Sequence, residues 1–288
     1  MGFFASVNGD VVPAAEARVS VLDNGFTFGD SVYETLRTYS GRPFHLDRHL
    51  ARLRQSAARL GIEIPLGDDV FAQRLATLLE RAQNEESYIR IIVTRGVGDI
   101  SYHFERVKGP TVVLAVKPYE PFPESTYTDG VAVIIASVRR NHPRALDPGI
   151  KSCNLLNNIL AVREAQSKGA LEPILLNEAG EVAEGASTNV FIVRGEEVTT
   201  PPLSAGILPG VTRQLLLEIG PAVGIPVVEE SVSVQDLLGA DEAFVTSTLK
   251  EAAPIRSVDG QLIGRGIPGP VTLRLLQAYR DYAKRVTA

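Results

Sequence analysis

The chain has 288 residues, of which 44% are hydrophobic and 22% charged, and its formal net charge is -5. This composition is typical of a globular protein that buries a substantial core in one large domain or two modest ones. The acidic balance, without basic runs among aromatic residues, argues against a nucleic-acid-binding surface, so no nucleic acid is expected as a partner. The one cysteine, Cys153, excludes an intrachain disulfide framework and a cysteine pair for a metal.

Neither a metal site nor membrane association is predicted. His45 and His49 have the i,i+4 spacing that could bring two imidazoles to one metal, but arginines surround His49, and we interpret both as surface residues of a helix. No run of about 20 apolar residues occurs, and the first residues do not resemble a secretion signal. We therefore expect a cytoplasmic protein.

The first part of the chain predicts a small α/β domain. Asn8-Gly9, between the apolar stretches 3–12 and 19–23, predicts a β-hairpin. A glycine-punctuated segment that starts at Asp23 becomes strand-like and ends at Tyr39, where a Ser-Gly turn reverses the chain. The patterns that follow indicate two amphipathic helices and two strands, at residues 46–60, 69–84, 87–96 and 111–116.

Prolines and a glycine predict an interdomain linker at residues 118–130. We therefore place a small N-terminal domain at 1–117 and a larger C-terminal domain at 131–288. In the second domain, strands and helices alternate irregularly. Strands are predicted at 131–138, 173–177, 227–230 and 243–246. Three helices are predicted: one that ends near residue 168, one that starts near residue 209, and one at 270–285. This order, without an internal repeat, is typical of an α/β or α+β chain.

The stretch from Asp147 to Asn154 stands out. Pro148 and Gly149 punctuate the backbone and apolar residues at near-helical spacing follow, so Lys151 is expected where an extended entry meets a helix. An amine held between apolar elements loses hydration, which lowers its pKa and makes it a nucleophile able to form a Schiff base. The plainer interpretation is that Lys151 extends from a helix start to the solvent.

Two further features form a chemical set with Lys151. Glu184 is a carboxylate beside Gly185, in a loop of otherwise small residues. A helix opens at Leu208-Pro209-Gly210-Val211-Thr212, and its free N–H groups and dipole can bind a phosphate. Amine, carboxylate and phosphate site are together what pyridoxal 5'-phosphate (PLP) requires. Alone, a loop glutamate is usually solvated and such a helix start is usually a cap.

Along essentially its whole length the sequence resembles the class IV, fold type IV PLP-dependent aminotransferases. The matching motifs are Gly29-Asp30-x-Val32-Tyr33-Glu34, His49-x-x-Arg52-Leu53, Ile150-Lys151-Ser152-x-Asn154, Glu184-Gly185-x-x-x-Asn189-Val190-Phe191 and Leu208-Pro209-Gly210-Val211-Thr212-Arg213. This family includes branched-chain aminotransferases, D-amino-acid aminotransferases and aminodeoxychorismate lyases. The resemblance implies a two-domain fold: a small N-terminal α/β domain, and a larger C-terminal domain with a barrel-like β core and flanking helices.

The resemblance also implies roles for individual residues. Lys151 would form the Schiff base with PLP and move the proton at the substrate Cα, while Glu184 would pair with the pyridinium nitrogen and Leu208 would pack on the ring. The remaining cofactor contacts, chiefly to the phosphate, would come from Arg52, Val211, Thr212, Ser247 and Thr248. The substrate would contact Phe28, Tyr33, Tyr88, Arg90, Thr248 and Leu249. Ordinary core packing is an equally good interpretation of the aromatic residues among these.

Within the family, Tyr88-Ile89-Arg90 and the Thr-Arg-Gly turn after it favour a transaminase that moves the amino group of a branched-chain L-amino acid to 2-oxoglutarate. Leu155-Leu156 and Ser247-Thr248 resemble the D-amino-acid branch more, so D-amino-acid transamination is the alternative and an aminodeoxychorismate lyase a further one. The family resemblance implies amino-acid and 2-oxo-acid substrates. It also implies a homodimer, in which a site between the domains is completed by a loop of the neighbouring subunit.

Overall fold

The computed structural model describes residues 1–266 and 268–288, and the chain forms two compact units. Unit 1 consists of Met1–Glu120, Ile150–Asn154 and Lys284–Ala288, and unit 2 of Pro121–Gly149 and Leu155–Ala283. These units differ from the predicted domains, 1–117 and 131–288, because two short segments of the second half pack with the first half. Each unit is described by itself below.

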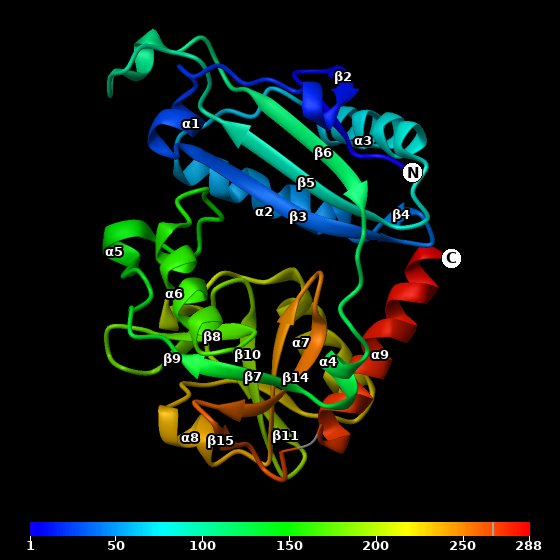
Figure 1. The fold of residues 1–288 in the computed structure, drawn as a ribbon, viewed down its shortest axis with the longest axis vertical. Coiled ribbons are helices and arrows are strands. Elements are labelled where there is room, and N and C mark those ends of the chain that lie inside the picture. The colour runs from blue at the N-terminus through cyan, green and yellow to red at the C-terminus, as the bar shows by residue number, and fades with distance from the viewer. Residues whose placement is uncertain (267) are drawn as a thin grey trace. The chain divides into compact units, whose positions relative to one another are not determined.

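Unit 1 is built on a six-stranded sheet in the order β2-β1-β6-β5-β3-β4, with neighbouring strands antiparallel (Figure 1). Its strands are β1 (Phe4–Val7), β2 (Asp10–Pro13), β3 (Ser31–Tyr39), β4 (Arg42–Pro43), β5 (Ser87–Thr94) and β6 (Val112–Pro118). Its helices are α1 (Asn24–Phe28), α2 (Leu46–Arg59) and α3 (Asp68–Ala82), with the short 3-10 helices η1 (Ala14–Glu16) and η2 (Phe104–Arg106).

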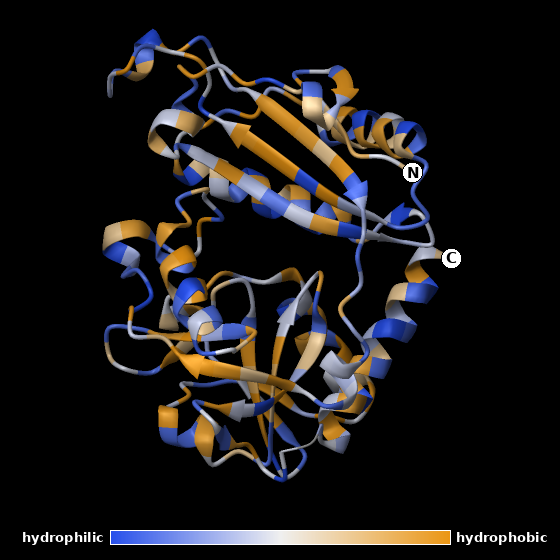
Figure 2. Cartoon of the chain, in the orientation of Figure 1, coloured by the Kyte–Doolittle hydropathy of each residue, from blue (hydrophilic) through white to orange (hydrophobic). Residues whose placement is uncertain are grey.

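One face of this sheet forms a hydrophobic core with α2 and α3. Buried and half-buried residues alternate along β3 and β5, as the two-residue period of a strand requires. The buried set includes Val32, Leu36, Ile89 and Leu53, each fully enclosed. Figure 2 shows the corresponding run of hydrophobic residues along β5 and β6. The opposite face is therefore left to side chains such as those at 33, 35 and 37, which are only half-buried.

Unit 2 contains a closed barrel of six strands, β10-β13-β14-β7-β8-β9, in which β9 pairs back to β10. The strands of the unit are β7 (Val131–Ile135), β8 (Glu172–Leu176), β9 (Val182–Gly185), β10 (Asn189–Arg194), β11 (Glu197–Thr200), β12 (Val227–Glu229), β13 (Glu242–Ser247), β14 (Glu251–Val258) and β15 (Gln261–Leu262). Its helices are α4 (Ser125–Thr128), α5 (Pro143–Leu146), α6 (Leu156–Ser167), η3 (Leu203–Ala205), α7 (Val211–Ala222), α8 (Val234–Leu238) and α9 (Pro270–Thr287), whose last residues belong to unit 1.

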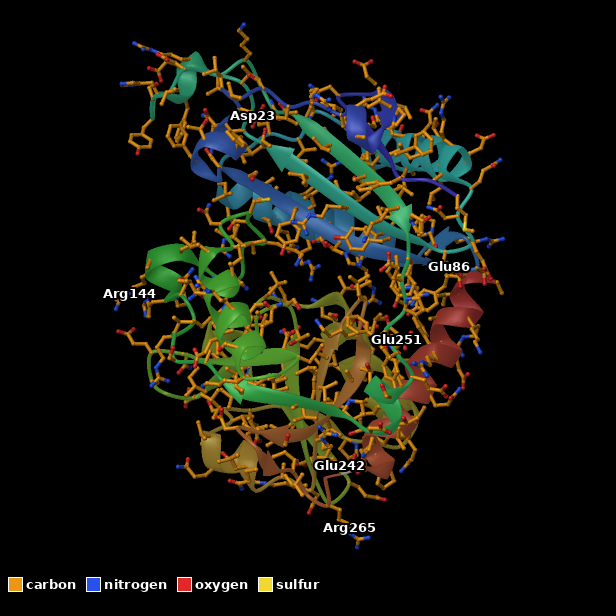
Figure 3. The ribbon with its side chains drawn as sticks, in the orientation of Figure 1. Asp23, Glu86, Arg144, Glu242, Glu251 and Arg265 are labelled. Carbon is orange, nitrogen blue, oxygen red and sulfur yellow. The ribbon has the colours of Figure 1, made fainter. Side chains whose placement is uncertain are left out.

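Helices α6, α7 and α9 are attached to the barrel in different ways. Helix α6 packs on β8 and α7 on β13. The start of α9 is fastened by Glu242, which is labelled in Figure 3 and accepts hydrogen bonds from the N–H groups of Val271 and Thr272 at 3.0 and 2.7 Å. A carboxylate at a helix start binds its unpaired N–H groups and complements the helix dipole.

The predicted elements are largely confirmed, and so is the barrel-like core. Both predicted helices of the first half occur as α2 and α3, and Asn8-Gly9 does join the hairpin strands β1 and β2. Residues 19–23 were predicted to take part in this hairpin, and that prediction is wrong. Of these residues only Asp23 forms a β-bridge, and its partner is Val97. The predicted linker contains the end of β6 and the short helix α4.

Helix α6 begins at Leu156, shortly after Lys151, as predicted, but its large apolar side chains do not form its buried face. Leu156, Ile159 and Leu160 are 68%, 57% and 47% exposed, whereas Ala161 and Ala165 are fully buried. Small side chains let the helix lie close to β7 and β8, so the leucines and isoleucine must point outward. Among the described residues, no helix is both long and apolar enough to cross a bilayer.

Candidate active site

In unit 1, Lys151 is held by hydrogen bonds from both sides of its backbone. The segment Ile150–Asn154 pairs with the start of β3: the N–H of Tyr33 donates to the carbonyl of Lys151 at 2.9 Å, and the N–H of Cys153 to the carbonyl of Ser31 at 2.9 Å. The N–H of Lys151 donates to Oγ of Ser56 on α2 at 3.1 Å. The helix predicted after this segment occurs as α6, whereas the predicted extended entry is a turn at residues 148–149 followed by a single β-bridge, between Ser152 and Val32.

The ammonium of Lys151 is half-buried against an aromatic ring. Its Nζ lies 4.5 Å from the ring centroid of Tyr33, within the range of a cation–π contact. Burial raises the pKa of Tyr33 above its ordinary value, although the charge of Arg90 acts in the opposite direction. The phenol therefore stays neutral near pH 7, and its ring contacts the ammonium of Lys151.

Behind Lys151, a carboxylate of β3 binds two residues of α2. The side chain of Glu34 is fully buried; its oxygens accept hydrogen bonds from Nε and Nη2 of Arg52, both at 2.7 Å, and lie 2.7 Å from Nδ1 of His49. Burial alone would raise the pKa of Glu34, but Arg52 and His49 outweigh it and hold that pKa far below its ordinary range. We call Glu34, His49 and Arg52 the Glu34 cluster.

The buried position of His49 corrects the prediction that it lies on the surface. Burial lowers the pKa of His49 although Glu34 acts the other way, so the imidazole is neutral near pH 7. Because Nδ1 must donate to the ionised carboxylate, Nε2 is left as an acceptor. That Nε2 is buried and has no hydrogen-bond partner within the described residues. His45 is half-buried, and no group of potential metal ligands occurs in the part of the chain that the structure describes.

The helix-free face of the unit 1 sheet carries three cations, Arg37, Arg90 and Lys117, which we call the cationic row. Each lies on tyrosine: Arg90 is 3.8 Å from the Tyr33 centroid, and Lys117 is 5.3 Å from that of Tyr88. Arg37 lies between the rings of two further tyrosines, at 4.1 and 3.7 Å. Within residues 1–266 and 268–288 no carboxylate forms an ion pair with any of the three. Half-buried cations without a counterion can bind an anionic ligand.

Phe28 is positioned by a buried aspartate that the sequence did not reveal. Asp23, labelled in Figure 3, begins α1: its Oδ1 accepts from the N–H of Gly25 at 2.8 Å, and its Oδ2 from the hydroxyls of Thr94 and Thr111 at 3.0 and 2.7 Å. Phe28 ends this helix, with its ring 5.2 Å from that of Tyr102. Asp23 thus ties α1 to the last residue of β5 and to the residue just before β6.

In unit 2, Glu184 lies in strand β9 rather than in the predicted loop, and it is 4% exposed. Arg140 Nε donates to its Oε1 at 2.7 Å, and the N–H of Leu208 donates to its Oε2 at 2.9 Å. Asn189, opposite it on β10, approaches Oε2 to 3.4 Å and donates to the carbonyl of Leu208 at 3.1 Å. The carboxylate is therefore fixed in direction by groups from three segments.

The start of α7 has the features of an anion site. Gly210 precedes the helix without a side-chain cap, so the first N–H groups have no partner inside the helix. A Cβ on Gly210 would lie 2.0 Å from Oδ1 of Asn189, so any larger residue there would displace the Asn189 side chain. Thr212 is 3% exposed, and its Oγ1 has no hydrogen-bond partner among the described residues; the same holds for Thr246 on β13. Arg213 instead pairs with Glu229.

A phosphate-bearing pyridine cofactor fits the chemistry of unit 2. Three features lie together in the described part of the unit. They are the buried carboxylate of Glu184, the half-buried Leu208 whose N–H donates to it, and the start of α7 with the unpartnered hydroxyl of Thr212. Ser247, Thr248 and Leu249 form the half-buried turn from β13 to β14. Asn189 and Glu34 belong to the sequence motifs, but no role was predicted for them. Arg140 was not predicted as a site residue, because its partner Glu184 is distant in the chain and no local pattern indicates the pair.

The chain is similar to known proteins of one family. A model of the family described as amino-transferase class IV matches residues 31–258. Over 275 residues the chain is 38% identical to a putative branched-chain-amino-acid aminotransferase of Methanocaldococcus jannaschii, covering 96% of this chain and 94% of the relative. Over 281 residues it is 36% identical to a D-alanine aminotransferase of Bacillus licheniformis, covering 98% and 97%.

The fold is also similar to solved structures. A T.th. branched-chain amino acid aminotransferase, crystallised with pyridoxamine 5'-phosphate, superposes with a TM-score of 0.91 at 30% identity, covering 98% of this chain and 94% of that one. The likeness therefore extends over both units.

Proposed function

This chain belongs to the class IV aminotransferases and is an aminotransferase, and we propose that it moves the amino group of a branched-chain L-amino acid to 2-oxoglutarate with PLP as its cofactor. Class IV aminotransferases use PLP, and a structural relative was crystallised with pyridoxamine 5'-phosphate. The observation that supports PLP most strongly is the braced Glu184 beside the α7 start, where the hydroxyl of Thr212 is buried without a partner in the described chain.

PLP, when bound, supplies an aldehyde that reacts with amines and a ring that accepts the electron pair left when a Cα proton departs. We assign Lys151 as the amine that attaches to this aldehyde and, once released, carries the proton away from Cα and returns it. The centroid of the neutral phenol ring of Tyr33 lies 4.5 Å from Nζ of the same lysine.

Three groups of residues hold the cofactor in this proposal. Glu184 keeps a proton on the ring nitrogen, because Arg140 and the N–H of Leu208 aim its carboxylate. Leu208 packs against the ring. The phosphate is bound by backbone N–H groups and hydroxyls of two segments: the start of α7, with Val211 and Thr212, and the β13–β14 turn, with Ser247 and Thr248. Arg52 of α2 adds a positive charge.

The cationic row supports a dicarboxylic acceptor. A 2-oxo acid with a second carboxylate needs a cation beyond the reacting carbon, and Arg90 is such a group, stacked on Tyr33 and hydrogen-bonded to Thr35 Oγ1 at 3.3 Å. We assign Tyr88 and Arg90 to the distal carboxylate, the backbone at Thr248 and Leu249 to the α-carboxylate, and Phe28 and Tyr33 to the side-chain pocket.

D-amino-acid transamination is the second candidate, because the relative of Bacillus licheniformis is named a D-alanine aminotransferase and is nearly as similar as the archaeal relative. No observation of the described residues favours the lyase reaction.

A panel of L- and D-amino acids tests the proposal. Each is added to the PLP-loaded protein, and the absorbance of the cofactor is followed through the half-reaction. We expect rapid conversion by L-leucine, L-isoleucine and L-valine, slow conversion by D-alanine, and no cofactor band in Lys151→Ala. Rapid conversion by D-alanine without reaction of L-leucine would replace the proposal by its alternative. Pyruvate released from aminodeoxychorismate without an acceptor would indicate the lyase.

We also propose a cytoplasmic homodimer. Two exposed apolar sets support an interface: Leu156, Ile159 and Leu160 on α6, and Ile100, Tyr102 and Phe104 in the loop between β5 and β6. Contiguous exposed apolar patches often mark protein–protein contact surfaces. Sedimentation of the wild type and of Ile159→Glu measures the oligomeric state, and a wild type that sediments as a monomer would contradict the dimer.

A further inference from the structure

A second buried ion pair lies in unit 2, separate from the pair of Glu184 with Arg140. Lys250 is 9% exposed, and its Nζ is 3.2 Å from Oε2 of Glu172 and 2.9 Å from Oγ of Ser187. Glu172, on β8, is 3% exposed. A lysine gives up its hydration at such a position only when charge and hydrogen bonds replace it.

Glu172 fastens the loop that follows Glu184. Its Oε1 accepts hydrogen bonds from the N–H of Ser187 at 2.8 Å and from Oγ1 of Thr188 at 3.0 Å. The packing is so close that a Cβ on Gly185 would lie 2.1 Å from the Thr188 hydroxyl and 2.8 Å from the Glu172 carboxylate. Because β9 ends at Gly185, this contact is one residue from Glu184.

Lys250 also closes the turn that contains Thr248. The N–H of Lys250 donates to Oγ of Ser247 at 3.0 Å, where β13 ends. The ammonium of the same residue donates to Ser187. One residue therefore joins the β13–β14 turn to the loop after β9, two segments that are distant in the sequence.

We propose that Lys250 is a positioning residue, which acts through Glu172 and Ser187 to hold the Glu184 end of β9 and the Thr248 turn at a fixed spacing. This inference rests on the proposed function, in which Glu184 binds the ring nitrogen of PLP and Thr248 its phosphate. A rigid cofactor that touches both segments is bound tightly only when their spacing matches its own length.

A direct role is the competing explanation, because Lys250 follows Leu249, whose backbone we assign to the substrate α-carboxylate. Glu172 argues against it: the ammonium already has a carboxylate at 3.2 Å, and the pair is buried. Binding a second carboxylate would leave that pair with an unbalanced negative charge. The two roles predict different kinetics, since only a direct contact acts mainly on the KM of the amino acid.

Three variants of the full-length protein test the role. Lys250→Met removes the charge but keeps the volume of the side chain, and Lys250→Arg restores a cation. The double variant Lys250→Met with Glu172→Gln leaves no unpaired charge and keeps an acceptor for Ser187 and Thr188, so we expect it to fold even if the single variant does not. Lys168→Met is the matched control, because Lys168 forms an exposed ion pair with Glu164.

The dissociation constant of PLP is measured by titrating each apoprotein with PLP, and thermal unfolding is followed without the cofactor. We expect Lys250→Met and the double variant to bind PLP about tenfold to a hundredfold more weakly, with partial recovery in Lys250→Arg and no change in Lys168→Met. PLP binding equal to wild type in the double variant would overturn the proposal, as would a raised KM with unchanged PLP affinity. A wild type that binds no PLP would overturn the proposed function itself.

Discussion

Each unit encloses a glutamate beside an arginine, but the two carboxylates are used in opposite ways. Glu34 in unit 1 receives side-chain hydrogen bonds from Arg52 and His49, so both of its oxygens bind side chains of one helix. Glu184 in unit 2 receives a hydrogen bond from the side chain of Arg140, while its other oxygen is oriented by the N–H of Leu208.

This difference in partners indicates different roles: the Glu34 carboxylate positions other residues, whereas the Glu184 carboxylate is itself positioned by its neighbours. Glu34 arranges the side chains of α2, whereas Glu184 is oriented by two side chains and a backbone group from elsewhere in the chain. We therefore expect changes at Glu34 to act first on stability and changes at Glu184 to act first on catalysis.

The largest effect is expected for Glu34→Gln. Removing this charge leaves Arg52 buried without its carboxylate, which typically costs about 3–5 kcal/mol in the free energy of unfolding. Urea denaturation of the apoprotein measures this loss. Glu80→Gln, on the outer side of α3, is the control and should change the value by less than about 0.5 kcal/mol. A loss at Glu34 no larger than that of the control would remove the contrast between the two glutamates.

Glu184→Gln sharpens the contrast from the other side. We expect kcat/KM to fall about 10²- to 10³-fold, equal to roughly 3–4 kcal/mol, as when a preorganised charge contact is removed. Arg140 keeps a second partner, Oδ1 of Asn157 at 3.1 Å, so the stability loss should be smaller than that of Glu34→Gln. Steady-state kinetics and urea denaturation of the same sample give both numbers. Glu197→Gln, exposed on β11, should change neither.

Arg140→Gln removes the residue that orients Glu184 and leaves the carboxylate in place. The expected decrease in kcat/KM is about tenfold to a hundredfold, the range typical when a group behind a functional residue is lost. The absorbance of the bound cofactor should shift as well, because the ring nitrogen would be held less firmly. Activity equal to that of the wild type would show that Leu208 and Asn189 suffice to orient Glu184.

The smallest effect is a pH dependence that comes from unit 1. Burial lowers the pKa of His49 below its ordinary 6.5, and Arg52 together with the hydrogen bond from His49 holds the pKa of Glu34 below its ordinary 4.5. In both cases the unfolded chain takes up the proton first as pH falls, so the free energy of unfolding decreases below pH 6.5 and again below pH 4.5. Urea denaturation at several pH values measures this. His49→Gln should flatten the upper part of the curve, and an unchanged slope would exclude His49 as its source.

The sequence predicted the elements and the motif residues but not the pairs that hold them. The periodic patterns of α2, α3 and β3 are local, and so they were predictable. Glu34 with His49 and Glu184 with Arg140 are pairs across separate elements, and no local pattern tells which buried carboxylate meets which cation. His49 was therefore predicted on the surface, although it is fully enclosed.

The site residues follow the same division. Lys151, Glu184 and the start of α7 belong to motifs with recognisable spacing, whereas Asp23, Arg140 and Lys250 act through contacts with distant segments. For Glu184, the motif was recognised but the local structure was predicted wrongly. The small residues around it indicated a loop, whereas the segment is a strand because Glu184 pairs with Asn189 and closes the barrel.

The pairing of Ile150–Asn154 with β3 has a consequence for biosynthesis. Residues up to Glu120 leave the ribosome before this segment, so until it arrives the N–H of Tyr33 and the carbonyl of Ser31 lack their final partners. Long-range pairings of this kind slow folding because a loop must close first. A fragment that ends at Glu120 should therefore be more susceptible to proteolysis near β3 than the same residues in the full chain. Lys151, which we propose as the amine that attaches to PLP, is placed only when that late segment docks.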